Sequence, residues 1–181
     1  SFDFSVEHLF VGAAFFISAW AASIWLGVRP STAAKDYGAM LSVWSLRFFL
    51  AAMAVMSFKE PWRELLDADF SHVPSMAVAV AALIAFSVVA VRGTGKMITF
   101  LFLGGFYLIA AAAVLLLRNP DFAIWFQAAF NVVLVGVGIR LILSGISQGI
   151  SHYFFLGIAS ILATALMRYA DLIGDYIGGA I

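Results

Sequence analysis

The segment from Met97 to Leu117 contains no charged residue and lies between Lys96 and Arg118. A helix of this length, at a rise of about 1.5 Å per residue, crosses a hydrocarbon core about 30 Å thick. The whole chain has a similar character, because 64% of its 181 residues are hydrophobic and only 11% are charged. Soluble domains carry about 25% charged residues. The sequence therefore predicts an integral membrane protein.

Five other apolar blocks accompany this segment along the chain. The blocks are continuous rather than alternating, which favours helices over the strands of a barrel. Connectors such as residues 92–96 and 118–121 are short and contain glycine or proline, so consecutive helices are expected to be antiparallel. We predict an all-α, polytopic transmembrane helix bundle with six spans at about residues 6–28, 37–58, 74–91, 97–117, 122–143 and 152–172.

The longest connector, residues 59–71, separates the second span from the third. Pro61 suits a first helical position. The apolar residues Trp62, Leu65 and Leu66 fall on one helical face, and the charged residues of the segment fall on the other. This pattern is typical of a short helix that lies in the membrane interface. We therefore predict such an interfacial helix between spans two and three.

The charges of the loops indicate the orientation, because Lys and Arg favour the cytoplasmic side. The loops after spans one, three and five hold five basic residues against one acid, and the opposite side holds four against nine. We place both ends outside the cytoplasm. Since the chain starts without a methionine and stops among apolar residues, we expect residues 1–181 to be one transmembrane domain from a longer protein. The five basic residues are Arg29, Lys35, Arg92, Lys96 and Arg140.

Arg47 is the most unusual polar residue within a predicted span. A central arginine costs about 2.5 to 3.5 kcal/mol on insertion scales, so it must face the bundle, pair with an acid, or snorkel. One interpretation is a contact to an anion or substrate, or an ion pair. The other is that span two begins near Leu46 and leaves Arg47 at the interface. We favour the structural interpretations, although a span that begins there is too short to cross.

Span five contains two further polar residues, Asn131 and Arg140, with Gly136 and Gly138 between them. One interpretation is a polar path through the bundle. We favour an interhelical hydrogen bond from Asn131 and an Arg140 side chain that snorkels. Small residues also predict helix contacts at a spacing of four, at Ala14, Ser18 and Ala22 and at Gly145 and Gly149.

The last polar cluster follows span six. In a helix, Arg168, Asp171 and Asp175 share one stripe at spacings of three and four, and Tyr169 lies on the next stripe. An acid pair beside an arginine at the membrane surface can bind a cation or carry protons. The same group can form an interfacial salt bridge with tyrosines of the aromatic belt, and we favour this structural interpretation.

The sequence lacks the residues that several kinds of catalytic or metal site require. There is no cysteine, which excludes disulfides and thiolate sites. The zinc, di-iron and serine-hydrolase templates also fail. His8 and His72 share a predicted depth and are the residues for a haem alternative, but we favour two interfacial histidines. Residues 92–96 lack the spacing of a phosphate loop and are predicted to be a turn. We expect no catalytic residue, no cofactor and no metal.

A glycine-bearing helix pair and a closing motif stand out in the C-terminal third. Residues 131–140 are followed by Gly145, Gly149 and Gly157, and then by residues 166–172, LMRYADL. This arrangement resembles the end of an uncharacterised family of bacterial polytopic inner-membrane proteins, domain of unknown function 2157. The resemblance implies a bacterial inner-membrane location and no known reaction. It carries over, without a role, the motif positions Arg168, Tyr169, Asp171 and Leu172.

The function that these features favour is not enzymatic. The sparse polar interior predicts a structural, assembly or accessory subunit of a larger membrane complex. Its expected partners are the lipid bilayer and other membrane proteins or further copies of the chain. The zero net charge gives no reason to expect nucleic acid. The alternative is a small-solute or ion transporter or channel with Arg47, Asn131 and Arg140 in the bundle.

Overall fold

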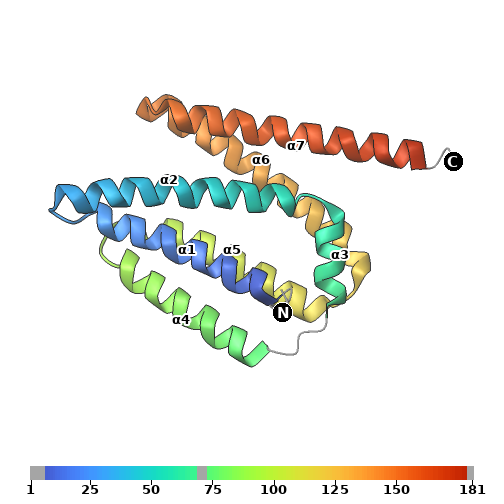
Figure 1. Cartoon of the computed structure of the whole chain (residues 1–181), viewed down its shortest axis with the longest axis horizontal. Helices are drawn as coiled ribbons and strands as arrows, with labels where there is room; N and C mark the ends of the chain where they lie inside the picture. Colours follow the sequence, from blue (N-terminus) through green and yellow to red (C-terminus); the bar gives the residue numbers. More distant parts are fainter. Residues whose placement is uncertain (1–6, 69–72, 179–181) are drawn as a thin grey trace, which may run out of the picture. The chain divides into compact units, whose positions relative to one another are not determined.

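The computed structural model describes residues 7–68 and 73–178, and this part of the chain is all-helical. Six of the helices are long and apolar enough to cross a membrane. The chain is therefore an integral, multi-pass membrane protein, and the predicted fold class is confirmed. The elements in chain order (Figure 1) are α1 (Glu7–Gly27), α2 (Thr32–Val55), α3 (Lys59–Asp67), α4 (Val73–Val91), α5 (Met97–Leu117), η1 (Pro120–Phe122), α6 (Ala123–Gln148) and α7 (Ser151–Gly178).

The predicted bounds agree best where charged residues flank an apolar block. The fourth predicted span matches α5 at both ends. In contrast, α2 begins five residues before the start of the predicted second span and ends three residues before its end. The Ser31 hydroxyl accepts a hydrogen bond from the Ala34 amide at 3.5 Å. A serine cap of this kind lets a helix begin among polar residues. The charged Lys35 and Asp36 therefore lie in the first turns of α2 rather than before it.

Contacts divide the chain into two compact units. Unit 1 consists of Ser1–Phe49 and Leu65–Arg118, and unit 2 consists of Leu50–Glu64 and Asn119–Ile181. The boundaries fall within α2 and α3, so each unit is built from segments that are distant in sequence. The expectation of a single transmembrane domain stays a prediction.

Small residues bring α1 and α4 together in unit 1. The Ser18 hydroxyl of α1 lies 3.0 Å from the Leu83 carbonyl oxygen and 3.0 Å from the Ser87 hydroxyl, both on α4. Ala14 and Ser18 are buried as the spacing predicted, but Ala21, rather than Ala22, completes the buried stripe. Without large side chains between them, the two backbones approach closely enough for these hydroxyls to meet.

The core of unit 1 also fixes α5. Its buried residues are Ile17 and Ala21 of α1, Ala90 and Val91 of α4, and Phe100 of α5. The Tyr107 hydroxyl donates a hydrogen bond of 2.8 Å to the Phe10 carbonyl oxygen of α1. This bond ties the middle of α5 to the beginning of α1.

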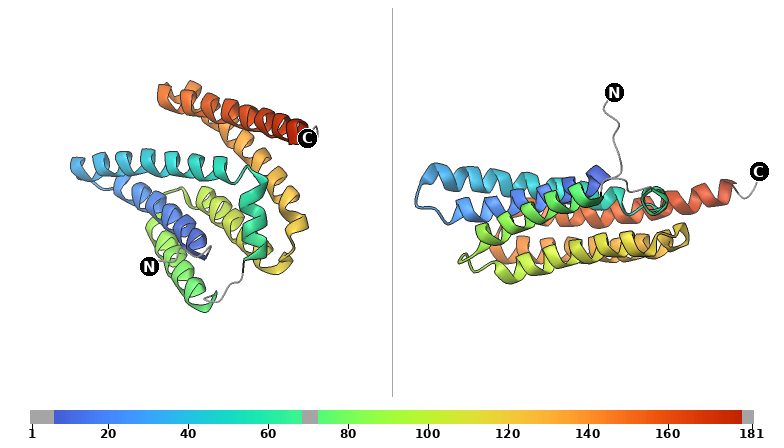
Figure 2. Two further views of the ribbon diagram at one scale, coloured as in Figure 1. Left: turned by 45° about the vertical axis from the view of Figure 1, so that its right-hand side comes forward. Right: turned by 90° about the horizontal axis from the view of Figure 1, so that it is seen from below.

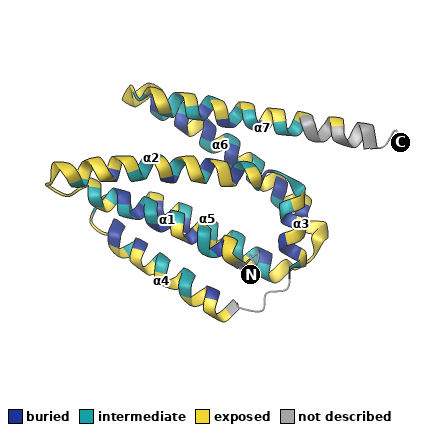
Figure 3. Ribbon diagram, viewed as in Figure 1, coloured by how far each residue is buried: buried dark blue, intermediate teal, exposed yellow. Residues whose placement is uncertain are grey.

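Large apolar side chains cover the outside of the helices. On α5, Ile98, Phe102, Ile109 and Leu116 are each more than 70% exposed, and exposed positions recur along the same helix in Figure 3. So much apolar exposure would be unfavourable in water. In a bilayer, lipid tails cover these side chains, in agreement with the membrane assignment.

In unit 2, α6 and α7 form a tight helical hairpin (Figure 2). Gly138 faces Gly157 and Ser160 of α7, and Gly145 faces the backbone of Phe154 so closely that a Cβ atom would lie 2.6 Å from its nitrogen. Gly149 ends α6 with a φ of 66°, a left-handed conformation that glycine adopts without strain. Of the glycines predicted to mark helix contacts, Gly145 packs against α7, whereas Gly149 only ends α6 and has nothing within 4 Å of its Cβ position.

Candidate functional site

The end of α2 is the point in unit 2 where polar side chains converge. The chain leaves the helix at Val55 and turns through Met56, Ser57 and Phe58 into α3. The last carbonyl groups of a helix have no partner within it, and in a membrane such groups must be satisfied by other donors. The following residues supply or accept these hydrogen bonds and are called the Ser57 node: Met56, Ser57, Trp62, Asn131, Met167 and Arg168.

The Ser57 carbonyl oxygen accepts hydrogen bonds from two helices. The Asn131 Nδ2 atom of α6 donates to it at 3.4 Å, and also donates to the Gln127 carbonyl oxygen at 2.9 Å. The Arg168 Nη2 atom of α7 is the second donor. Ser57 itself is completely buried, and its hydroxyl donates to the Ala54 carbonyl oxygen at 2.6 Å. A single backbone carbonyl therefore connects the end of α2 to both helices of the hairpin.

Charge strengthens this arrangement. The carbonyl end of a helix carries a partial negative charge, and a cation beside it is stabilising. Arg168 is half-buried and supplies such a cation to the end of α2. Hydrogen bonds to a charged group contribute about 1.5–3 kcal/mol, roughly twice the usual value. The arrangement explains how an arginine is accommodated next to apolar segments of α2 and α6.

The indole of Trp62 completes the node from α3. Its Nε1 atom donates to the Met56 carbonyl oxygen at 2.6 Å. The Trp62 ring is 2% exposed and lies 4.9 Å from the Phe126 ring and 4.6 Å from the Phe130 ring, measured between centroids. The predicted α3 helix and its two faces are confirmed, since Leu65 and Leu66 are also buried. The structure adds that Trp62 of the apolar face packs on aromatic rings of α6.

One hydrogen-bond acceptor of the Ser57 node, a side-chain oxygen of Asn131, is not used within the described residues. The Asn131 Oδ1 atom is buried and accepts no hydrogen bond from the part of the chain that the structure describes. Both hydrogen bonds of the Asn131 amide are donated by Nδ2 to carbonyl oxygens. The amide therefore acts as a double donor here.

The other predicted polar residues are dispersed. Arg140 is exposed on α6, nine residues after Asn131, which places the two side chains about half a turn apart on the helix. Tyr169 is 64% exposed. The side chains of Asp171 and Asp175 lie outside the described residues. Of the seven candidate residues, Asn131 and Arg168 are thus the two that the described structure brings together.

Arg47 lies on an exposed face of α2 in unit 1. Its guanidinium carbon is 5.4 Å from the centroid of the Trp44 ring, one turn earlier. The neighbouring Phe48 stacks on Phe16 of α1 at a centroid distance of 5.0 Å. Because α2 begins at Thr32, Arg47 lies well inside the helix.

Ser57 and Met167 were not candidates in the sequence, and Trp62 was expected only as part of the apolar face of an interfacial helix. Ser57 follows the end of α2 by two residues and Trp62 follows Ser57 by five, and this spacing matches no known motif. The one indication in the sequence was general: the last carbonyl groups of a buried helix need hydrogen-bond donors from elsewhere in the protein. Asn131 was predicted to make an interhelical hydrogen bond, and its bond outside α6 goes to the Ser57 carbonyl oxygen in the turn after α2.

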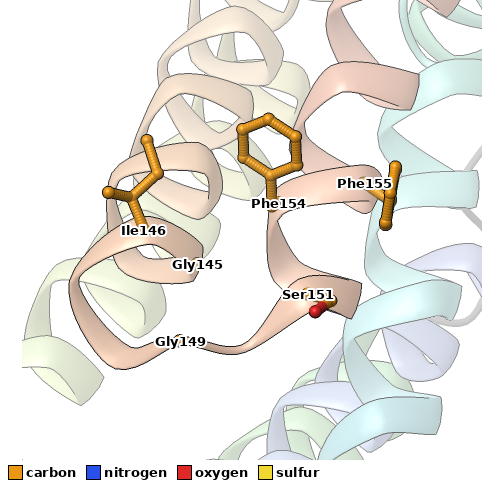
Figure 4. Close-up of a pocket in the computed structure, with 6 residues that line it drawn as sticks. All are labelled: Gly145, Ile146, Gly149, Ser151, Phe154 and Phe155. Atoms are coloured by element: carbon orange, nitrogen blue, oxygen red, sulfur yellow. The ribbon is translucent and has the colours of Figure 1, made fainter.

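The depression at the turn between α6 and α7 offers little chemistry. It lies beside this turn (Figure 4). Its volume is about 350 Å³. No side chain that lines it is titratable. The described residues contain no group of three His, Asp or Glu able to hold a metal ion, and His72 of the haem alternative lies outside them. The lining residues are Gly145, Ile146, Gly149, Ser151, Phe154 and Phe155.

Comparison with protein-family models, with curated proteins and with solved structures finds no match to this chain. The fold defines the class of protein, a multi-pass helical membrane protein in which the Ser57 node joins the end of α2 to the α6–α7 hairpin.

Proposed function

We propose that this protein is a non-enzymatic structural, assembly or accessory subunit of a larger membrane complex. The observation that carries the proposal is the Ser57 node. Asn131 and Arg168, two of the polar residues available for a path or a reaction centre, each donate a hydrogen bond to the Ser57 carbonyl. Polar groups with this use stabilise a fold rather than bind a solute.

The exposed face of α2 supports a role in assembly. Tyr37, Met40, Trp44 and Phe48 recur at helical spacing and are each more than 40% exposed, with Arg47 on the same side. Aromatic residues, methionine and arginine are the types enriched in protein interfaces. In lipid, Arg47 has a large unfavourable insertion energy, and a carboxylate on a neighbouring helix would reduce it. A partner subunit with an acidic residue at this depth fits the patch.

Transport is the second candidate. The buried Asn131 Oδ1 atom favours it, because an acceptor without a protein donor can take one from water or a solute. Against it, Asn131 and Arg140 lie on opposite faces of α6 and cannot line one path along that helix. The weight of these observations supports the subunit role.

The proposal also covers the cellular location and the family of the protein. We propose that it belongs to the inner membrane of a bacterium, with its N-terminus on the non-cytoplasmic side. The Lys and Arg residues of the loops, five on the proposed cytoplasmic side against four on the other, support this orientation. The resemblance of residues 131–172 to domain of unknown function 2157 supports the bacterial location, and it assigns no reaction.

The test is affinity purification in a mild detergent, followed by mass spectrometry. The chain and its Arg47→Leu variant are compared, with Arg140→Leu as a matched control, because Arg140 is also an exposed arginine within a long apolar helix. Stoichiometric partners that the Arg47→Leu variant alone loses would support the subunit role. A solitary protein whose reconstituted vesicles show a solute flux that requires Asn131 would refute it in favour of transport.

A further inference from the structure

The two turns at one end of unit 1 gather basic residues that the proposed function does not use. Ala21 near the end of α1, Val91 at the end of α4 and Phe100 near the beginning of α5 belong to one buried cluster. The α1–α2 turn and the α4–α5 turn therefore lie at the same end of unit 1, as Figures 1 and 2 also show. This end carries four exposed cations, here called the basic end: Arg29, Lys35, Arg92 and Lys96.

The beginning of α2 belongs to the same end. A Cβ atom at Gly38 would lie 3.0 Å from the Gly27 nitrogen at the end of α1, so the first turns of α2 run directly beside α1. Lys35 lies one turn before Gly38. The two helices that flank the first turn are thus held close together, so Arg29 and Lys35 lie at the same end of unit 1.

The positive charge of the basic end is not neutralised within the unit. Asp36 is the acid of this region, and no ion pair joins it to any of the four cations in the described part of the chain. A net excess of positive charge at the end of several apolar helices lies at the depth of the lipid headgroups. Such clusters attract anionic lipids, and each basic residue near the surface adds to the attraction.

Trp25 gives the basic end an aromatic component. The Arg29 guanidinium carbon lies 4.0 Å from the centroid of the Trp25 ring. This distance is typical of a cation–π contact, which restricts the arginine without consuming its hydrogen-bond donors. Tryptophan is enriched at the headgroup level of membranes. The pair therefore places arginine donors where a lipid phosphate would lie.

The turn between α4 and α5 has the geometry for close approach by a headgroup. Gly93 and Gly95 have φ values of 79° and 72°, which glycine adopts without strain. The Thr94 hydroxyl donates to the Val91 carbonyl oxygen at 2.7 Å and so closes the turn. The compact turn presents Arg92 and Lys96 on either side of residues that have little bulk.

We propose that the basic end binds the phosphate-bearing headgroup of an anionic phospholipid. Phosphate oxygens accept hydrogen bonds from Arg29 and Arg92, and Lys35 and Lys96 supply further positive charge. The lipid tails lie along the apolar helices below the turns. The occupant is a lipid rather than free phosphate, because the cations stand directly at the ends of membrane-spanning segments.

Native mass spectrometry of the whole chain in detergent tests the proposal, with phosphatidylglycerol and phosphatidylcholine offered in equal amounts. The wild type is expected to retain phosphatidylglycerol preferentially. The Arg29→Gln/Arg92→Gln variant is expected to lower this preference, by up to about fivefold for each charge removed. The matched control is Arg63→Gln, which removes an exposed cation from α3. A wild type without preference, or equal losses in the variant and the control, would overturn the proposal.

Two further arms identify the source of the phosphate and guard against misfolding. Inorganic phosphate is added in excess, and phosphatidylglycerol is expected to stay bound, whereas its displacement would assign the site to a free anion and overturn the lipid proposal. If Arg29→Gln/Arg92→Gln loses its helical circular dichroism, Lys35→Gln/Lys96→Gln takes its place. Because both lysines are exposed, an unchanged lipid preference in that folded variant would equally overturn it.

Discussion

Replacement of Gly145 by alanine tests the close packing of the α6–α7 hairpin. The added Cβ atom would lie 2.6 Å from the Phe154 nitrogen and 2.9 Å from its Cα atom. Comfortable contacts of this kind need at least about 3.5 Å, so the two backbones must separate by roughly 0.9 Å. Both atoms belong to the backbone, so no side-chain rotation relieves the clash. Overpacking of this kind costs about 1–3 kcal/mol.

Gly136→Ala is the matched control on the same helix. Nothing lies within 4 Å of the position that its Cβ atom would take. Both substitutions gain the same intrinsic helix propensity, about 1 kcal/mol relative to glycine. The difference between the two variants therefore isolates the packing energy of the hairpin.

The assay is the free energy of unfolding in mixed micelles, titrated with a denaturing detergent and followed by circular dichroism. Gly145→Ala is expected to be about 1–3 kcal/mol less stable than Gly136→Ala, which corresponds to a factor of roughly 5 to 150 in the unfolding equilibrium. Equal stabilities of the two variants would refute the packing that we describe for the hairpin.

Three other substitutions give expectations in the same assay. Trp62→Phe keeps an aromatic ring but leaves the Met56 carbonyl without its indole donor, so a loss of about 1–3 kcal/mol is expected, and no loss would argue against that hydrogen bond. Tyr107→Phe removes the hydrogen bond from α5 to α1 and is expected to cost about 0.5–1.5 kcal/mol; a stabilised variant would contradict this contact. Arg47→Leu is expected to leave the stability unchanged or raised, because it removes a charge from an exposed position on a long apolar helix, and a large destabilisation would point to an internal partner.

Flanking charges decided how well the helices could be predicted. Lys96 and Arg118 bracket a continuous apolar block, and the predicted span matches α5 at both ends. The beginning of α2 was predicted too late, since Lys35 and Asp36 resemble loop residues in a hydropathy pattern. The local hydrogen bond at Ser31 determines where the helix begins, and hydropathy does not contain this information.

The candidate site was predicted in part. A polar residue such as Asn131 in an apolar span needs a partner, so a hydrogen bond between helices could be expected from its chemistry alone. Its acceptor, the Ser57 carbonyl, is a backbone atom 74 residues away and has no signature in the side-chain sequence. Arg168 was recognised as part of a local stripe, but its contact to Ser57 depends on how α7 packs in unit 2.

A double-mutant cycle of Asn131→Leu and Arg168→Met tests most directly whether the polar residues of the Ser57 node serve the fold. Both side chains donate to the same carbonyl oxygen, so their effects on the free energy of unfolding should be coupled, by about 0.5–3 kcal/mol. We predict that each single variant has a lower free energy of unfolding than the wild type. We also predict that the loss in the double variant differs from the sum of the two single losses. The account would be contradicted if both single variants kept the stability of the wild type, their effects on the free energy of unfolding were additive, and the variants lost a solute flux.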